Sequence, residues 1–382
     1  MPRSVAKVSL VSMTPGTSRR LTVFRWGRPG ARPKAYLQAA IHANELPGVM
    51  AIHHLIPLLD QAAKQRRIKG EIVVVPTANP IGLSQLVGNI HLGRYDFLGR
   101  ENFNRNYPDL AEAVAERVAK KLGRSARANT AAIRAAALAT LAALKPANEL
   151  GQLRGALMRH SIDADIVLDL HCDQGGVLHL FISGKDWPGA RDLAAQLGAA
   201  ATVYNVPYPE TMTFSGANSA LWPKLAERFP KAAIPLACLS ATVEFRGQHK
   251  VTHELGAADA RNLFKFLQRR GVIAGSPGPL PRLLAQATPT PGMDVGYAPA
   301  HGMLTFRKPA GAKVRAGETV CEVIDPLNPD TRKARVPVKA RTSGILFSRR
   351  PNGRLVWPGM VLFRIAGAKA LPHRKGLSGL DD

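Results

Sequence analysis

The sequence predicts an α/β fold, with a mainly parallel or mixed sheet flanked by helices, followed by a small all-β domain. Apolar runs of strand length alternate with helical patterns through the first two thirds of the 382-residue chain, an order that is typical of a sheet covered by helices. Beyond residue 294, short apolar runs are separated by glycines, and no convincing helix occurs before residue 366. This second pattern favours a β domain of about 80 residues.

The elements of the α/β part follow from local patterns. Apolar runs bounded by turn residues predict strands over residues 4–13, 21–26, 36–41, 71–76, 166–170, 178–182 and 241–245. Apolar residues at helical spacing predict helices over residues 49–65, 110–122, 131–144, 149–160, 190–197, 222–228 and 257–270. The alanine-rich stretch 110–160 is expected to be a helical insertion between two strand–turn motifs.

A segment rich in glycine and proline, residues 275–281, is typical of a linker. It separates a predicted α/β domain over residues 1–285 from a predicted β domain over residues 290–370. We expect the tail, residues 371–382, to be disordered.

The composition limits the class of protein. A hydrophobic content of 46% with 21% charged residues is ordinary for a globular protein with a large core. No apolar stretch is long enough for a membrane span, and the N-terminus lacks the apolar core of a signal peptide. The three cysteines, Cys172, Cys238 and Cys321, have neither zinc-knuckle nor disulfide-framework spacing. We therefore expect a cytoplasmic protein without a membrane partner.

The net charge of +25 is the unusual feature of the composition. The excess is densest between residues 302 and 375, where sixteen basic residues meet four acidic ones. Such a charge suits an anionic partner, but it also suits a merely solvated surface. Because no RNA-binding signature or aromatic–basic interleaving accompanies it, a solvated surface is the favoured explanation of the charge. As a partner we expect a small anionic substrate rather than a nucleic acid.

His42 and Glu45 form the first motif with chemical meaning. They come after the apolar run 36–41 and precede Pro47, so both side chains lie at the mouth of a predicted strand. An imidazole and a carboxylate three residues apart can reach one metal ion, and zinc accepts nitrogen and oxygen ligands together. With 11 histidines in the chain, the pattern alone is also a chance event, so its meaning depends on motifs farther along the chain.

A second apolar run, residues 167–173, carries His171 at the C-terminal end of a predicted strand. Ligands bind at that end of open α/β sheets. Two histidines and one glutamate with an open position are the ligand set of a catalytic zinc site. Asp169 lies on the same face of the strand and is a candidate to contact His171. By itself, His171 is equally well explained as a satisfied buried histidine.

Three further motifs carry candidate catalytic and binding residues. Arg94 offers a cation for a developing oxyanion, and Asn104 with Arg105 offers a fork for a substrate carboxylate. Glu244, the single acid in the strand 241–245, could accept and donate protons beside a metal. Each of these residues alone could be an ordinary surface residue, whereas their order along the chain is informative.

This ordered set resembles the succinylglutamate desuccinylase/aspartoacylase family of the zinc carboxypeptidase superfamily, over about residues 36 to 250. The resemblance implies a carboxypeptidase-like mixed sheet flanked by helices, and one zinc ion per subunit. It implies His42, Glu45 and His171 as zinc ligands. It also implies Glu244 as general base and acid, Arg94 as the group that polarises the scissile carbonyl, and Asn104 and Arg105 as the residues that hold a substrate carboxylate.

The chain also departs from the family pattern. The first motif has Ala43 and Asn44 where the family commonly has glycine and aspartate, so the loop loses glycine's conformational freedom at position 43. The arginine that members acting on acyl-aspartate carry upstream of the general base is absent, since Ile234 and its neighbours are apolar. Arg228, Lys231 and Arg246 are only loose substitutes, so a dicarboxylic substrate is not expected.

The β domain resembles the lipoyl/biotinyl-like barrel-sandwich module that occurs in this family. Lys339 lacks the flanking methionines of a carrier lysine, so a biotin or lipoate attachment site is not expected. We interpret the domain as a wall or lid of the site and as a candidate homo-oligomer contact. Tyr297 is a candidate to enter the pocket, although an aromatic residue that packs the barrel is the simpler interpretation.

The sequence thus predicts a zinc-dependent amidohydrolase, a deacylase that cleaves an amide bond of a carboxylate-bearing small molecule such as an N-acyl amino acid. The first alternative is a carboxypeptidase-like peptidase acting on peptide or peptidoglycan, and the second is a non-catalytic polyanion-binding protein. Serine-nucleophile, Walker and dinucleotide-binding motifs are absent from the sequence. Cys172 is not expected to be a nucleophile, because adjacent residues of a strand point to opposite faces and it comes directly after His171.

Overall fold

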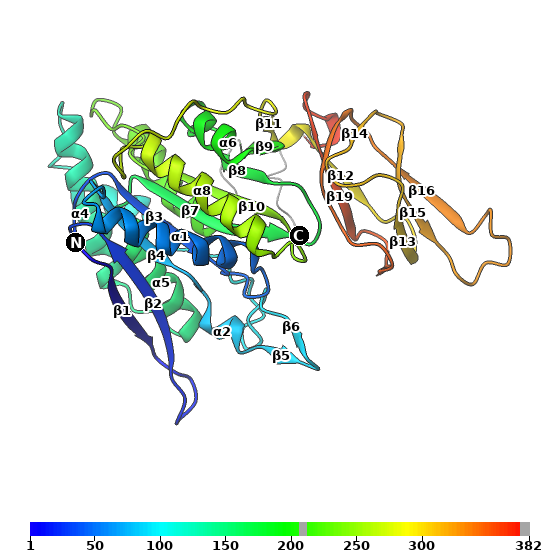
Figure 1. Cartoon of the computed structure of the whole chain (residues 1–382), viewed down its shortest axis with the longest axis horizontal. Helices are drawn as coiled ribbons and strands as arrows, with labels where there is room; N and C mark the ends of the chain where they lie inside the picture. Colours follow the sequence, from blue (N-terminus) through cyan, green and yellow to red (C-terminus); the bar gives the residue numbers. More distant parts are fainter. Residues whose placement is uncertain (206–211, 375–382) are drawn as a thin grey trace.

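The computed structural model describes residues 1–205 and 212–374 and is built around a nine-stranded sheet (Figure 1). The strand order is β1-β2-β4-β3-β7-β10-β8-β9-β11. The strands are β1 (Ser4–Leu10), β2 (Arg19–Trp26), β3 (Lys34–Ala39), β4 (Glu71–Val75), β7 (Ile166–Asp173), β8 (His179–Ser183), β9 (Ala201–Asn205), β10 (Leu239–Gly247) and β11 (Thr288–Pro289). The central strands β4, β3, β7 and β10 run parallel, whereas β1, β2 and β8 pair antiparallel with their inner neighbours. The predicted mixed sheet is therefore confirmed.

Helices cover both faces of the sheet. The buried stripe of α1 (Pro47–Lys64) packs with α6 (Arg191–Leu197) and α8 (His253–Arg269) on one face. The other face is covered by α3 (Ala111–Val118), α4 (Ala126–Ala143), α5 (Glu149–Ser161) and α7 (Phe214–Arg228). Neighbouring strand residues divide between the two cores, as the two-residue period of a strand requires.

The helical insertion predicted for residues 110–160 is confirmed, since α3, α4 and α5 lie there. The predicted helix at 222–228 is too short, because α7 begins at Phe214. The helix starts at the Thr213 cap, whose side chain accepts from Gly216 N, and Pro223 lies inside the helix. The short elements α2 (Pro80–Leu83), β5 (Leu86–Val87), β6 (Ile90–His91), β9 and β11 were not predicted.

The C-terminal β region, residues 293–367, forms two four-stranded sheets that Figure 1 shows beside the α/β part. The first sheet contains β12 (Met293–Tyr297), β19 (Val361–Gly367), β17 (Gly344–Arg349) and β14 (Lys313–Val314). The second contains β16 (Arg335–Lys339), β15 (Thr319–Ile324), β13 (Gly302–Phe306) and β18 (Leu355–Val356). The predicted domain boundaries stay a prediction. Within the predicted tail, η3 (Pro372–Arg374) is a short 3₁₀ turn, and residues 375–382 lie outside the described residues.

The β region contacts the α/β part next to the C-terminal ends of β7 and β10. Val177 N donates to Phe347 O at 3.0 Å, and Arg349 N donates to Gly175 O at 2.7 Å. A side chain at Gly176 would come within 2.8 Å of Phe347 O, so the close approach requires glycine there. These contacts bring the β region to the sheet edge that carries the predicted metal ligands.

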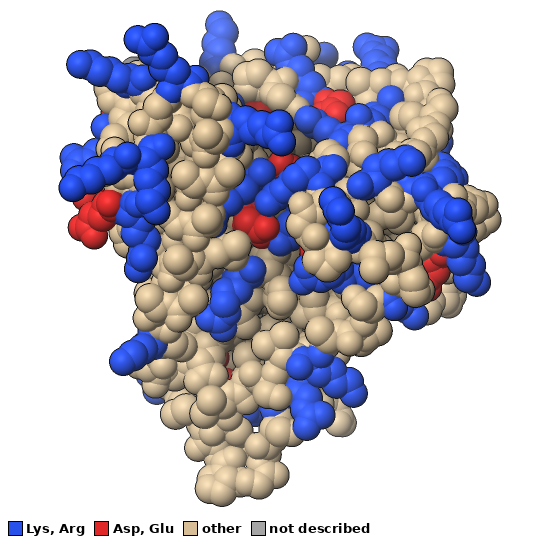
Figure 2. All heavy atoms as spheres, turned by 90° about the vertical axis from the view of Figure 1, so that its left-hand side faces the viewer, with Lys and Arg blue, Asp and Glu red and all other residues tan. Residues whose placement is uncertain are grey.

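Basic side chains are spread over the face that carries the N-terminus and α4, with few acidic ones between them (Figure 2). The exposed basic residues between the end of α3 and the first turn of α4 include Lys120, Lys121, Arg124 and Arg127. The partner of this charge stays a prediction. Among the described residues, no helix has both the length and the apolar character needed to cross a bilayer.

Asp186 is a buried acid of the α/β core with an expected effect on stability. Its Oδ2 has no hydrogen-bond partner among the described residues, and burial raises the pKa of Asp186 to about 7. The folded chain therefore holds a proton that the unfolded chain releases near pH 4, so stability falls as pH rises from about 4 to 7. We expect Asp186→Asn to raise the free energy of unfolding at pH 8 by about 2–4 kcal/mol, and by less at pH 5. Denaturant unfolding at both pH values measures this difference, and an equal effect at both would contradict it.

Candidate functional site

Three predicted ligands meet at one edge of the sheet. His42 and Glu45 lie in the turn between β3 and α1, where Glu45 N donates to His42 O at 3.0 Å. His171 comes from the C-terminal end of β7, the neighbour of β3 in the sheet. All three residues are buried. The turn is held in place because Asn79 Nδ2 donates to Ile41 O at 2.7 Å.

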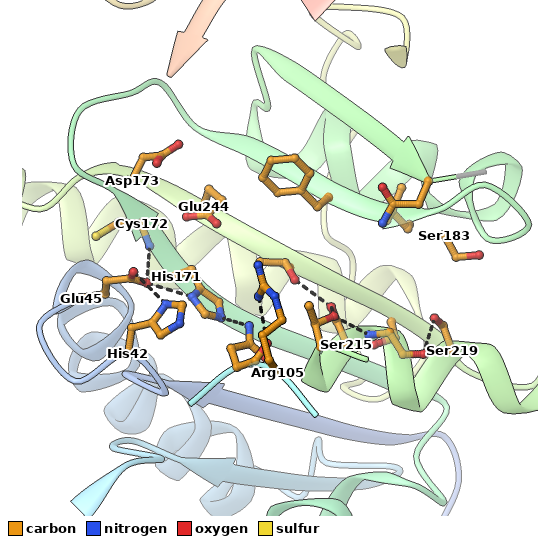
Figure 3. A pocket seen from close by; sticks show the side chains of 18 of the residues that line it. His42, Glu45, Arg105, His171, Cys172, Asp173, Ser183, Ser215, Ser219 and Glu244 are labelled. Atoms are coloured by element: carbon orange, nitrogen blue, oxygen red, sulfur yellow. Dashed lines mark hydrogen bonds and ion pairs between the residues drawn. The ribbon is translucent and has the colours of Figure 1, made fainter. Parts of the chain in front are cut away.

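The ligand atoms converge on one point between the three side chains. His42 Nδ1 lies 2.9 Å from Glu45 Oε1, and His171 Nδ1 lies 2.8 Å from Glu45 Oε2. One ligand atom from each residue lies within 4.8 Å of the others. A metal ion could therefore be held by these three residues (Figure 3).

The opposite nitrogens of both imidazoles face acceptors. His42 Nε2 is 2.9 Å from Asn102 Oδ1, and His171 Nε2 is 2.8 Å from Asp169 Oδ2. Asn102 Oδ1 also accepts from Asn104 N at 2.8 Å, so this oxygen is an acceptor in both contacts. The N–H groups therefore belong on Nε2, and the Nδ1 lone pairs are directed at the Glu45 carboxylate. Such an arrangement of lone pairs needs a cation between them.

The pKa values of Glu45 and His171 indicate the same need for positive charge, whereas burial lowers the pKa of His42. Burial alone would raise the pKa of Glu45, but His42 and His171 outweigh burial and hold this pKa well below its usual range. Burial would lower the pKa of His171, yet Asp169 and Glu45 raise it well above 6.5. The site thus stabilises a positive charge beside Glu45, either as a proton on His171 Nδ1 or as a metal ion.

Glu244 lies next to the cluster on β10, in register with His171 of β7. Its Oε2 is buried and has no hydrogen-bond partner among the described residues. Burial, with smaller contributions from Asp173 and Glu45, raises the pKa of Glu244 well above 4.5. Figure 3 shows its carboxylate beside the ligand cluster. A carboxylate in this environment is suited to proton transfer.

The predicted arginines flank the cluster, whereas Asn104 has mainly internal contacts. Arg94 Nη1 lies 3.4 Å from both Glu45 Oε1 and His42 Nδ1. Arg105 lines the pocket, and its Nη1 donates to Asn104 O at 3.0 Å. Asn104 Nδ2 is 3.2 Å from His171 Nε2, and its Oδ1 accepts from Phe214 N at 2.8 Å. The contact with Phe214 N fixes the start of α7, and a substrate contact by Asn104 stays a prediction.

The cluster opens into two adjoining cavities. The first, of about 90 Å³, runs from the three ligands past Arg105 to hydroxyl side chains of α7 and β10. The second, of about 460 Å³, is lined mainly by the β region, including Tyr297 and Trp357. Arg364 of β19 lines both cavities. The β region thus forms part of the wall, as its predicted position implied.

Several residues of the site were not predicted. Asn102, which contacts His42, has no signal beyond its place beside the Asn104 motif. Ser215 and Ser219 come from α7, whose start was placed too late, and Arg364 comes from the β region. Of the loose arginine candidates, Arg246 pairs with Asp259 instead of lining the first cavity.

Cys172 contributes its backbone rather than its thiol. Its N–H donates to Glu45 Oε2 at 3.3 Å. Burial, reinforced by Glu45 and Glu244, raises the pKa of the thiol far above its usual range. A thiolate nucleophile is therefore unfavourable here, as the strand position predicted.

Comparisons with solved structures agree with this fold. A candidate succinylglutamate desuccinylase/aspartoacylase from Shewanella frigidimarina NCIMB 400 is 22% identical, with a TM-score of 0.84 over 96% of this chain and 97% of its own. A candidate member of the same family from Shewanella amazonensis SB2B is 24% identical, with a TM-score of 0.80 over 96% and 98%. The product-bound ectoine utilization protein EutE (DoeB) from Ruegeria pomeroyi is 17% identical, with a TM-score of 0.67 over 96% and 95%. At these identities the likeness concerns the fold.

The sequence itself also matches a family model. No curated protein matches the chain significantly. Residues 31–147, which include His42, Glu45, Arg94 and Arg105, match the family described as Succinylglutamate desuccinylase/Aspartoacylase catalytic domain. The predicted resemblance is therefore confirmed for residues 31–147, which match the catalytic-domain model of this family.

Proposed function

We propose that the protein is a zinc-dependent hydrolase that removes an acyl group from the amine of a carboxylate-bearing small molecule. The observation that carries the proposal is a cluster that requires a cation, next to a carboxylate whose buried Oε2 has no partner among the described residues. His42, Glu45 and His171 supply the first, and Glu244 supplies the second. Two imidazoles and one carboxylate are ligands that suit zinc and leave a position open.

Zinc would be held by His42 Nδ1, His171 Nδ1 and the Glu45 carboxylate. When bound there, it supplies a Lewis acid that lowers the pKa of water and polarises a carbonyl. Asp169 and Asn102 keep the Nδ1 atoms directed at the ion, since they accept the protons of the two Nε2 atoms. The donor set therefore fits the proposed ion.

The remaining roles fall to the residues around the cluster. Glu244 takes a proton from the attacking water and returns it to the leaving nitrogen as the amide bond breaks. Arg94, beside Glu45, is positioned to stabilise the oxyanion that develops on the carbonyl oxygen. Arg105, farther along the cavity, is positioned to pair with the substrate carboxylate.

The test uses the full chain, loaded with zinc, and a panel of N-acetyl and N-succinyl amino acids. We expect release of a free amine, loss of the activity after chelation, and its return when zinc is added. Absence of hydrolysis across the panel by zinc-loaded protein would contradict the proposal.

A peptidase is the second candidate, and the cavity of about 460 Å³ beside the cluster favours it. That space would admit a longer acyl group or a peptide than the cavity of about 90 Å³ alone. Short peptides and peptidoglycan stem peptides in the same assay separate the two candidates. Faster cleavage of peptides than of acyl amino acids would favour the peptidase.

A further inference from the structure

The cavity beyond Arg105 ends in a group of buried hydroxyl side chains. Figure 3 shows the metal ligands and Glu244 at one end of the cavity, Arg105 between, and Ser183, Ser215 and Ser219 at the other end. Thr242 contacts Ser215, and Ser240 precedes Thr242 on β10. We refer to the second end as the hydroxyl end, and it is defined by Ser183, Ser215, Ser219, Ser240 and Thr242. All five are less than a tenth exposed. They come from three elements, β8, α7 and β10, so they meet only in the folded chain.

The hydroxyl end retains hydrogen-bonding capacity. Ser240 is 1% exposed, and its Oγ has no partner among the described residues. Ser215 Oγ and Thr242 Oγ1 lie 2.8 Å apart, and Ser219 Oγ donates to Gly216 O at 3.2 Å. Because each hydroxyl offers one donor and two acceptor positions, these contacts leave acceptors unused. A buried polar group without a partner is unfavourable unless a ligand or water satisfies it.

The charged side chains that line the cavity lie away from the hydroxyl end. The acidic side chains among its described lining residues are Glu45, Asp173 and Glu244, and Figure 3 shows all three at the metal end. Arg364 also belongs to the metal end, because it lies 4.0 Å from Asp173. Arg105 is therefore the cation nearest to the hydroxyl end among the described lining residues (Figure 3). If Arg105 pairs with the substrate carboxylate, the end beyond it offers hydroxyl groups rather than charge.

We infer that the hydroxyl end is a specificity subsite for a short, uncharged, hydrogen-bonding side chain, either a hydroxyl or a carboxamide. This inference rests on the proposed function, in which the carboxylate at Arg105 fixes the orientation of the substrate. An apolar side chain would leave Ser240 unsatisfied. A second carboxylate would be desolvated without a cation of its own.

The experiment compares kcat/KM of the zinc-loaded protein for N-acetyl derivatives of serine, threonine, asparagine, alanine, leucine and aspartate. We expect the first three to exceed leucine and aspartate by at least about tenfold, because a site built to hydrogen-bond a substrate discriminates strongly against analogues without the polar group. Alanine is the internal reference, since its side chain is too short to reach the hydroxyls.

Ser240→Ala removes the unpartnered hydroxyl and breaks no hydrogen bond of that side chain with the described residues. We expect this variant to lose about tenfold of the serine-to-alanine ratio of kcat/KM. Ser161→Ala is the matched control, because Ser161 is equally buried but does not line the cavity. It should leave the ratio unchanged.

The results of the kinetic comparison test the specificity subsite and the proposed function separately. Hydrolysis with a preference for leucine or aspartate would overturn the inference and leave the function standing. If no acyl amino acid is cleaved, the function fails, and binding of free amino acids to zinc-loaded protein decides the subsite. Calorimetry should then show serine and asparagine binding more tightly than leucine and aspartate, and the reverse order would overturn the inference as well.

Discussion

We expect Glu244→Gln to lower kcat on an N-acyl amino acid by about 10³-fold, with the zinc content unchanged. Glutamine has nearly the same volume and retains hydrogen-bonding atoms, but it cannot take a proton from water. Glu244 is not one of the three residues whose ligand atoms converge, so the metal should stay in place. Steady-state kinetics and elemental analysis of the same preparation measure the two quantities together.

A matched control for this variant is Glu322→Gln in the β region. Glu322 is a buried strand acid, but it pairs with Arg307 and lines neither cavity of the site. The control should retain wild-type kcat. If Glu244→Gln keeps more than a tenth of the activity, Glu244 is not the group that moves the proton.

The sequence could predict that the candidate site residues come together, because they lie at strand ends. His42, Glu45 and His171 come just after or at the end of β3 and β7, and Glu244 lies near the end of β10. Parallel neighbouring strands deliver their C-terminal ends to one edge. The sequence does not state that β3, β7 and β10 are neighbours, but any order with them adjacent brings these side chains together.

Part of the cavity lining could not be predicted, for two physical reasons. Its α7 residues lie in a stretch rich in serine, glycine and asparagine, residues 215–219, whose intrinsic helix propensity is low. Tertiary packing of Phe214 and Trp222 holds that stretch helical. Arg364 enters the cavity from the β region, and no local pattern signals a contact between such distant segments.

Two of the unpredicted strands, β9 and β11, escaped prediction because their pairing is tertiary. β11 is two residues long and contains Pro289, so it carries almost no local signal. β9 pairs with β8 and β11 and packs against Met293 and Phe347, at the contact with the β region. Strand propensity depends on such neighbours more than on the strand's own sequence.

A second cluster of histidines complicates any metal analysis of this protein. His53, His54 and His253, on α1 and α8, also place one ligand atom each within 4.8 Å of the others. His54 Nε2 and His253 Nδ1 are 3.1 Å apart, and two of the three residues are exposed. Zinc bound there during purification would add to the measured content. His253→Ala is therefore the background in which the catalytic cluster should be tested.

In that background we expect about one zinc per chain, falling to near zero with His171→Ala. The loss follows from geometry, since His171 supplies one of three converging ligand atoms and Glu45 would lose its partner at 2.8 Å. Hydrolysis should disappear with the metal, and circular dichroism should show that the fold is kept. Full zinc content in His171→Ala with His253→Ala would place the metal elsewhere.

Asp169→Asn tests how the orientation of His171 affects zinc binding, because it leaves all three proposed ligands in place. Asp169 Oδ2 accepts from His171 Nε2 at 2.8 Å, while its Oδ1 accepts from Gln38 Nε2 at 2.9 Å. Asparagine keeps the volume, but it removes the charge that fixes the proton on Nε2. We expect zinc affinity to fall by about 10- to 100-fold without complete loss. Competition with a chromogenic chelator measures this affinity. An unchanged affinity would mean that the backbone of β7 alone orients the Nδ1 lone pair of His171. An intermediate loss of affinity would show that the Asp169 carboxylate is needed to orient His171.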